Sequence, residues 1–182
     1  MTKLLYVLTF TLGAVFCYLF LAAAGASARP DPNVGFKDWV TVFFAIAALL
    51  ASLGALYFNW RKAKQDTFLN IHQQLIALDI QEGRRILFQK ITSPEAASQL
   101  LIDDPDDYQK VNRALAMYDV LGLYVKRRYV FKSWVLEEWG ANLSKAREPG
   151  RHFINHRKAN GVPSLWGNFD KLSLEASILH QK

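Results

Sequence analysis

The feature that most constrains this chain is an uncharged, mainly apolar run from Trp39 to Phe58. A helix of about twenty residues spans roughly 30 Å, which matches the hydrocarbon core of a bilayer. Lipid offers the backbone no hydrogen-bond partners, so such a run must be helical. Trp39 and the segment Tyr57–Trp60 place aromatic rings at its two ends, as membrane interfaces favour. The run predicts a transmembrane helix over about residues 39–58.

Three basic residues, Arg61, Lys62 and Lys64, follow this run directly. Positive charge beside a membrane helix marks its cytoplasmic end. The chain from residue 61 to residue 182 is therefore predicted to be a cytoplasmic domain. We expect the protein to lie in the inner (plasma) membrane, with its C-terminal domain in the cytoplasm.

A second apolar segment, Leu4 to Ala24, precedes the first and is about as long. The two segments predict a hairpin over residues 1–60, with helices at about 4–24 and 39–58 and a short external loop at 25–38. Cleavage of the first segment as a signal peptide is the alternative, because Ala26-Ser27-Ala28 resembles a peptidase site. The segment exceeds the usual 7–15 apolar residues of a signal, which favours the retained helix.

Small residues recur at every fourth position of the second membrane segment, at Ala47, Ala51 and Ala55. This spacing lets two helices approach closely within a bilayer. Packing against the first segment is the simplest use, and packing between two copies of the chain is the alternative.

Periodicity predicts that residues 61–182 form an all-α bundle, because no stretch alternates with period two. The second membrane helix is expected to continue to Leu78, and Asp79 to cap the next helix. Ser93-Pro94 and Asp104-Pro105 are typical helix starts. The helix after Asp104 is expected at the centre of the bundle, with Gly122 allowing a close contact.

The later helices are predicted from apolar spacing and from helix breakers. An amphipathic helix is expected over residues 132–146, and a break at Pro149-Gly150. A short basic helix follows at residues 151–158. Ser164 is expected to cap the last helix, which contains Leu165 and Trp166.

No residue pattern nominates a catalytic or metal site. His152 and His156 share a helix face, but residue 153 is Phe, where a metalloprotease motif requires Glu. The acidic run Asp103 to Asp107 lacks the glycine and later glutamate of a calcium loop, so helix capping explains it better. The only cysteine, Cys17, excludes a disulfide within one chain. We expect no enzymatic activity, no metal and no cofactor.

Positive charge and aromatic residues form the candidate interaction surfaces. Beyond Asn59 the chain has 19 Lys and Arg against 14 Asp and Glu. The candidate membrane-facing or partner-binding residues are Arg61, Lys62, Lys64, Lys126, Arg127, Arg128, Arg147, Arg151, Arg157 and Lys158. The candidate core or interface aromatics are Trp134, Trp139 and Trp166.

One stretch gives the chain a resemblance to known proteins. The sequence YDVLGLYVKRRY (Tyr118 to Tyr129), then Trp134 and Trp139, Arg157 after HFINH, and Trp166 with Phe169, is similar to a bacterial family. Its members are short membrane-anchored proteins with an all-helical cytoplasmic domain of unknown function. This chain has Asp119 where the family has an acidic residue, and Tyr129 where the family often has glycine. The resemblance implies the architecture and assigns no activity.

The leading functional hypothesis is a membrane-tethered interaction or regulatory module that binds a protein partner or anionic lipid of the inner leaflet. A membrane-associated effector that acts on its own membrane or on nucleic acid is the alternative from another class. Direct nucleic-acid binding is a weaker hypothesis, because no recognised binding motif accompanies the basic residues.

Overall fold

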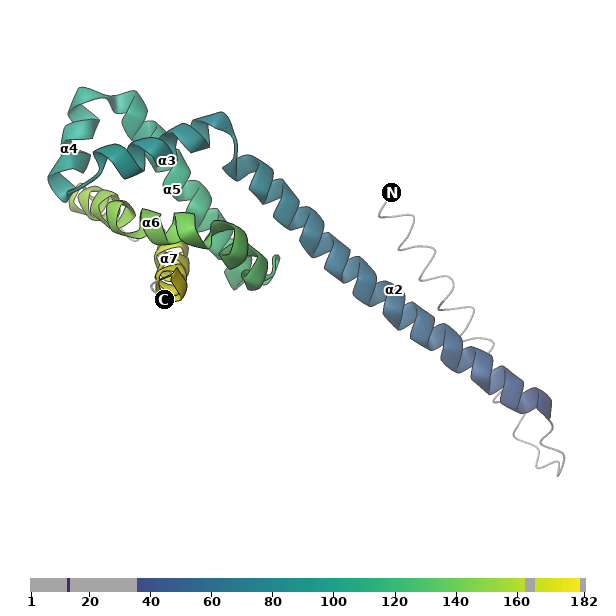
Figure 1. Ribbon diagram of the computed structural model, residues 1–182. Helices are drawn as coiled ribbons and strands as arrows, with labels where there is room; N and C mark the ends of the chain where they lie inside the picture. The colour runs from purple at the N-terminus through teal and green to yellow at the C-terminus, as the bar shows by residue number, and fades with distance from the viewer. Residues whose placement is uncertain (1–12, 14–35, 163–165, 181–182) are drawn as a thin grey trace. The chain divides into compact units, whose positions relative to one another are not determined.

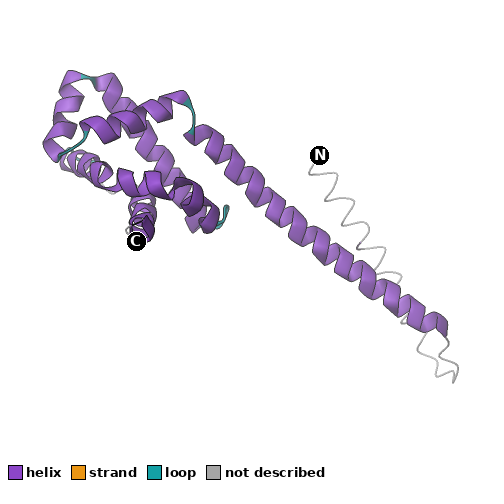
Figure 2. Ribbon diagram, viewed as in Figure 1, coloured by secondary structure: helices purple, strands orange, loops and turns teal. Residues whose placement is uncertain are grey.

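The structure of the protein, a computed structural model, describes Gly13, residues 36–162 and residues 166–180. Within these ranges every regular element is a helix and no strand is present (Figure 2). The prediction of an all-α fold is confirmed. The segment Leu4–Ala24 lies outside the described residues, apart from Gly13, as does most of the loop at 25–38. The helices are α2 (Phe36–Leu75), α3 (Leu78–Lys90), α4 (Pro94–Asp103), α5 (Pro105–Lys126), α6 (Lys132–Ala159) and α7 (Gly167–His180) (Figure 1).

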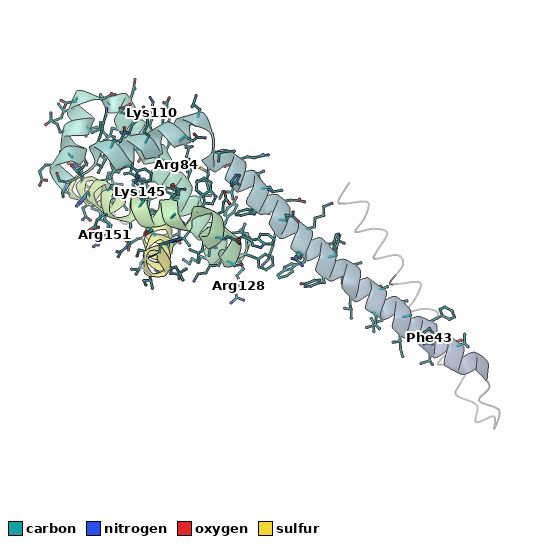
Figure 3. All side chains as sticks on the ribbon, in the orientation of Figure 1. Phe43, Arg84, Lys110, Arg128, Lys145 and Arg151 are labelled. Atoms are coloured by element: carbon teal, nitrogen blue, oxygen red, sulfur yellow. The ribbon has the colours of Figure 1, made fainter. Side chains whose placement is uncertain are left out.

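The chain divides into two compact units, Met1–Lys62 and Ala63–Lys182, and the division falls within α2. In the first unit, α2 is the one described helix that is long and apolar enough to cross a membrane. Its large apolar side chains are exposed, and Phe43 is one of them (Figure 3). Ala47, Ala51 and Ala55 are exposed as well.

Helix α2 begins at Phe36, three residues before the predicted start of the membrane helix. The prediction that residues 36–38 belong to the loop is therefore wrong. Gly35 is the last helix-breaking residue of the connector, and residues 36–38 contain neither glycine nor proline. Nothing in this segment opposes continuation of the helix.

Two predicted helix starts in the second unit are confirmed by their capping hydrogen bonds. The Ser93 side chain accepts from the Ala96 amide at 3.2 Å, and the Asp104 carboxylate accepts from the Asp107 amide at 3.0 Å. The predicted cap at Asp79 is wrong. Helix α3 already begins at Leu78, so Asp79 lies in its first turn. A carboxylate in the first turn still interacts favourably with the helix dipole.

Helix α6 continues through Pro149-Gly150, where the sequence predicts a break. The predicted separate helix at 151–158 is therefore its C-terminal part. Continuation keeps an unbroken stripe of buried residues on one face, and tertiary packing of such a stripe outweighs local propensity. The buried residues at spacings of four and three are Trp139, Leu143, Ala146, Gly150 and Phe153.

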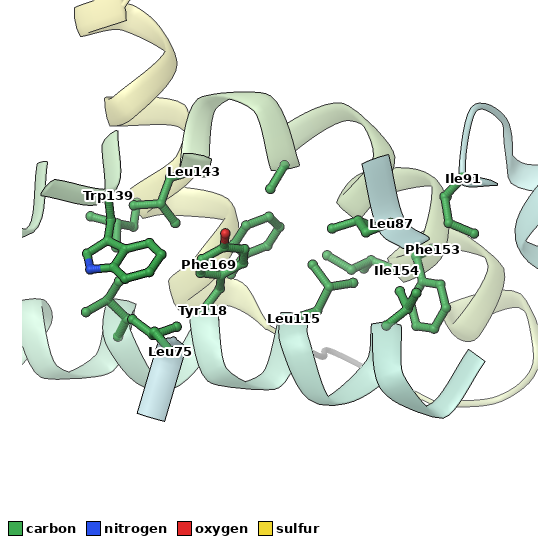
Figure 4. Close-up of a cluster of buried hydrophobic side chains, with 14 of the residues drawn as sticks. Leu75, Leu87, Ile91, Leu115, Tyr118, Trp139, Leu143, Phe153, Ile154 and Phe169 are labelled. Atoms are coloured by element: carbon green, nitrogen blue, oxygen red, sulfur yellow. The ribbon is translucent and has the colours of Figure 1, made fainter. Parts of the chain in front are cut away.

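Helix α5 lies at the centre of the second unit, as predicted, and packs against α3, α4, α6 and α7. Its Tyr118 is fully buried and stacks on Phe169 of α7, with ring centroids 5.8 Å apart (Figure 4). Farther along the core, Phe153 of α6 lies 4.6 Å from Tyr108, between ring centroids. One continuous apolar core thus joins α2 to α7 through α5.

Helix α7 begins at Gly167, and its N-terminus is capped from another helix. The Asp119 carboxylate of α5 accepts hydrogen bonds from the backbone amides of Asn168 at 2.9 Å and Phe169 at 3.0 Å. Because α7 starts after Trp166, the prediction that Trp166 belongs to this helix is wrong. Leu165 and the predicted cap, Ser164, lie outside the described residues.

Gly122 permits the close approach of α5 and α7. A Cβ atom at this position would lie 2.6 Å from the carbonyl oxygen of Asn168, which is too close for any side chain. The predicted close contact at Gly122 is confirmed. Together with the Asp119 cap, it fixes where α7 docks on α5.

Candidate functional site

The end of α2 is docked on the beginning of α6 by aromatic side chains. The Lys64 ammonium lies 4.4 Å from the centroid of the Phe131 ring. One turn later, the Phe68 ring meets the Trp134 ring edge-on at 5.9 Å. Ile71 and Leu75 then enter the core and are almost fully buried. Residues 64–75 of α2 are therefore part of the bundle.

The turn between α5 and α6 has the hydrogen bonds of a Schellman motif. The amide of Arg128 donates to the carbonyl of Val125 at 3.0 Å, and the amide of Tyr129 donates to the carbonyl of Tyr124 at 2.9 Å. The Tyr124 and Tyr129 rings meet edge-on at 5.7 Å, which supplies the apolar contact of the motif. This turn buries the next residue, Val130, and begins α6 two residues later.

Arg128 occupies the position of this motif that glycine normally takes. Its φ of 60° lies in the left-handed region, where a Cβ atom crowds the following carbonyl. The cost for a residue other than glycine is about 1 kcal/mol. A strained residue retained by the surrounding structure is a reason to look for a function. Arginine at this position adds a solvent-exposed positive charge that glycine cannot supply.

We call the four exposed residues Lys126, Arg127, Arg128 and Tyr129 the basic corner. Arg128 points away from the bundle at the end of α5 (Figure 3). Across the described ranges, the three cations have no carboxylate within ion-pair distance. The neighbouring Lys132 differs, because its ammonium pairs with Glu175 at 2.5 Å. The basic corner therefore presents uncompensated positive charge beside an exposed tyrosine.

The other predicted basic residues lie elsewhere. Arg61 and Lys62 are exposed in the first unit, on α2. Arg147, Arg151, Arg157 and Lys158 lie on the last three turns or so of α6, starting about 22 Å along the helix from Lys132. Of these, Arg151 approaches Glu148 at 4.0 Å.

The three predicted aromatics occupy three different places. Trp134 belongs to the contact between α2 and α6 described above. Trp139 is 4 % exposed, and the Arg84 guanidinium lies 4.9 Å from the centroid of its ring. Its indole nitrogen has no hydrogen-bond partner in the described part of the chain. Trp166 stacks on Phe153 at 6.1 Å.

His156 and Asp107 each have a structural partner. The ring of His156 shares a hydrogen bond with the Ser98 hydroxyl at 2.8 Å. Asp107 accepts a hydrogen bond from Lys90 at 2.7 Å, and this bond lowers the pKa of the Asp107 carboxyl. No cluster of three or more His, Cys, Asp or Glu that could hold a metal occurs within the described ranges.

A hollow of about 240 Å³ opens on the second unit, between α5 and the end of α6. The sequence did not predict this hollow, because its polar residues are far apart in the chain. Asn112 and Arg157, for example, are separated by 45 residues. Sequence reasoning also missed the Asp119 cap, although an acidic residue in the middle of an apolar helix is a usable signal. The lining residues are Leu101, Tyr108, Gln109, Asn112, Arg157, Asn160 and Val162.

Comparison with known proteins gives no relative. The chain matches no protein-family model, no curated protein and no solved structure. The resemblance to short membrane-anchored bacterial proteins therefore stays a prediction. The functional argument rests on the geometry of this chain alone.

Proposed function

We propose that this protein is a membrane-tethered helical module whose basic corner binds anionic lipid headgroups of the inner leaflet. In this proposal, residues 39–58 of α2 cross the bilayer as the second span of a hairpin, and the bundle lies on the cytoplasmic side. The role is structural or regulatory, with no chemistry of its own. Positive-inside orientation supports the topology, because Arg61, Lys62 and Lys64 follow the apolar run.

The observation that supports this proposal most directly is the contact between Lys64 and Phe131. Lys64 is only four residues beyond Trp60, the last aromatic residue at the end of the apolar run. Even a fully extended chain of four residues spans at most about 14 Å. Lys64 must therefore lie close to the membrane surface at any angle between the bundle and the span. Phe131 holds the turn between α5 and α6 beside it, so the basic corner is close to the surface too.

The chemistry of the basic corner suits an anionic lipid surface. Each Lys or Arg close to such a surface contributes about 1 kcal/mol. Among the described residues, the three cations of the corner have no acidic partner that would have to be displaced. Tyr129 is 55 % exposed and adds an amphipathic ring of the kind that lies at headgroup level. A requirement for positive charge at this position explains why the strained φ of Arg128 is retained.

The test is native mass spectrometry of the full-length protein titrated with phosphatidylglycerol in neutral detergent. The variant replaces Lys126 and Arg127 by Gln and Arg128 by Gly. We expect it to bind about tenfold more weakly or worse, because three contacts of about 1 kcal/mol each are removed. Relief of the strained φ should at the same time stabilise the bundle by up to about 1 kcal/mol.

A matched variant removes three exposed charges elsewhere on the bundle and should bind lipid as the unchanged protein does. Equal loss of lipid in both variants would mean that only net charge matters, and the corner would have no special role. Lipid binding unaffected by the corner variant would reject the proposal outright. The control substitutions are Arg85→Gln, Arg151→Gln and Lys171→Gln, all at exposed positions.

A further inference from the structure

Arg157 is a half-buried cation whose hydrogen-bond and ring contacts, within the described ranges, are with uncharged side chains. Its guanidinium donates a hydrogen bond to the side-chain oxygen of Asn112, on α5. The Cζ atom of the guanidinium lies 5.3 Å from the centroid of the Trp166 ring. Among the residues that the structure describes, no carboxylate lies within ion-pair distance of it. Burial of a charge without a counterion is unfavourable, so such a cation attracts an anion.

The hollow beside Arg157 is lined by polar groups that do not neutralise it. Gln109, Asn112 and Asn160 each carry an amide, and Tyr108 carries a hydroxyl. Three acids at the start of α5 are close in sequence, but none of them lines the hollow, and one of them, Asp106, is exposed to solvent. Asp104 caps α5, and Asp107 is paired with Lys90 and Lys110. The wall of the hollow is therefore rich in donors and carries positive charge.

We propose that this hollow is a binding site for a small organic anion, held through its carboxylate or phosphate group by Arg157. The planar guanidinium matches the two oxygens of either group. Asn112 and Trp166 hold the guanidinium in place, which reduces the entropy lost on binding. The side-chain amides can bond to polar groups on the body of the ligand. The hollow of about 240 Å³ admits an oxyanion with a few additional carbon atoms.

The positive charge of Arg157 acts on the hydroxyl of Tyr108, which lines the same hollow. Burial raises the pKa of the Tyr108 hydroxyl, and the positive charge of Arg157 opposes this rise. The neutral phenol is therefore available as a hydrogen-bond donor at neutral pH. This site does not depend on the lipid contact proposed above, because the hollow lies within the second unit and is lined by other residues.

The test is isothermal titration calorimetry of the full-length protein in neutral detergent, with inorganic phosphate in one arm and acetate in the other. We expect saturable binding in the millimolar range or tighter in at least one arm, and the stronger arm identifies the anion class. Arg157→Gln should weaken this binding at least tenfold. Absence of saturable binding in both arms would overturn the proposal.

Asn112→Asp separates ligand binding from folding. It gives Arg157 a carboxylate partner, so the bundle should melt at the same or a higher temperature while anion binding falls at least tenfold. Arg151→Gln, on the exposed side of the same helix, is the matched control and should leave the affinity within twofold. Anion binding that persists in Asn112→Asp, or falls equally in the control, would contradict a site at Arg157.

Discussion

Replacing Phe169 by alanine should lower the free energy of unfolding by about 3–5 kcal/mol, as for other fully buried aromatic side chains. The Phe169 ring of α7 is completely buried against α5 and α6 and stacks on Tyr118 (Figure 4). Gly150 of α6 lies against the same ring and cannot refill the space. Denaturant unfolding of the full-length protein in neutral detergent, followed by tryptophan fluorescence, measures the loss.

Tyr118→Phe is the control for this prediction, because it alters the partner ring without creating a large cavity. The Tyr118 hydroxyl is buried and has no hydrogen-bond partner among the residues that the structure describes. Burial raises the pKa of this hydroxyl, and the nearby Arg84 guanidinium offsets only part of the rise. Removal of an unsatisfied buried hydroxyl should leave the stability unchanged or increase it. A loss above about 1 kcal/mol would show that the hydroxyl has a partner.

Gly122→Ala should destabilise the bundle although alanine is the better helix former. The new methyl group would collide with the backbone of Asn168, which cannot move without breaking the Asp119 cap. Overpacking of this kind costs about 1–3 kcal/mol, and the gain in helix propensity returns up to about 1 kcal/mol. We expect a net loss of about 1–2 kcal/mol. Faster hydrogen exchange of the α7 amides should accompany it.

Gly167→Ala tests whether this effect comes from the contact. Gly167 also lies on a helix, at the start of α7, but a Cβ atom there would meet no atom of the described residues within 4 Å. This substitution should be neutral or slightly stabilising. Equal destabilisation by both substitutions would contradict the assignment of close packing to Gly122.

The sequence predicted those helix ends that depend on neighbouring residues. Ser93 and Asp104 cap the helices that follow them, and the side chain and its target amide are three residues apart. The core position of α5 was predictable as well, because its apolar spacing is regular. Helix α2 ends at Leu75, close to the predicted end at Leu78.

The errors arose where distant residues decide the structure. Pro149 stays inside α6 because burial of the residues on either side of it stabilises the helix by more than the missing backbone hydrogen bond of proline costs. Asp119 caps α7 from a position 49 residues earlier in the chain, so its position in the sequence does not identify the amides that it binds. The contact of Lys64 with Phe131 and that of Asn112 with Arg157 are equally remote in the sequence. Both proposed binding sites depend on such remote pairs.

The proposed lipid contact depends on where the turn between α5 and α6 lies relative to the bilayer. The most direct measurement places a spin label at Ser133 of the full-length protein in nanodiscs, after Cys17→Ser. Ser133 is exposed one residue into α6 and lies outside the basic corner. A second label at Ile102 serves as the reference, because the 22 residues of α5 separate the two labelled ends by about 33 Å.

We predict that phosphatidylglycerol in the nanodisc lowers collisions of the Ser133 label with a water-soluble nickel complex and leaves the Ile102 label unchanged. Lipid-dissolved oxygen should reach the Ser133 label more readily than the Ile102 label. This result would place the basic corner at the headgroups of a bilayer crossed by α2. Two labels that remain equally accessible to nickel, with or without anionic lipid, would contradict the proposed function.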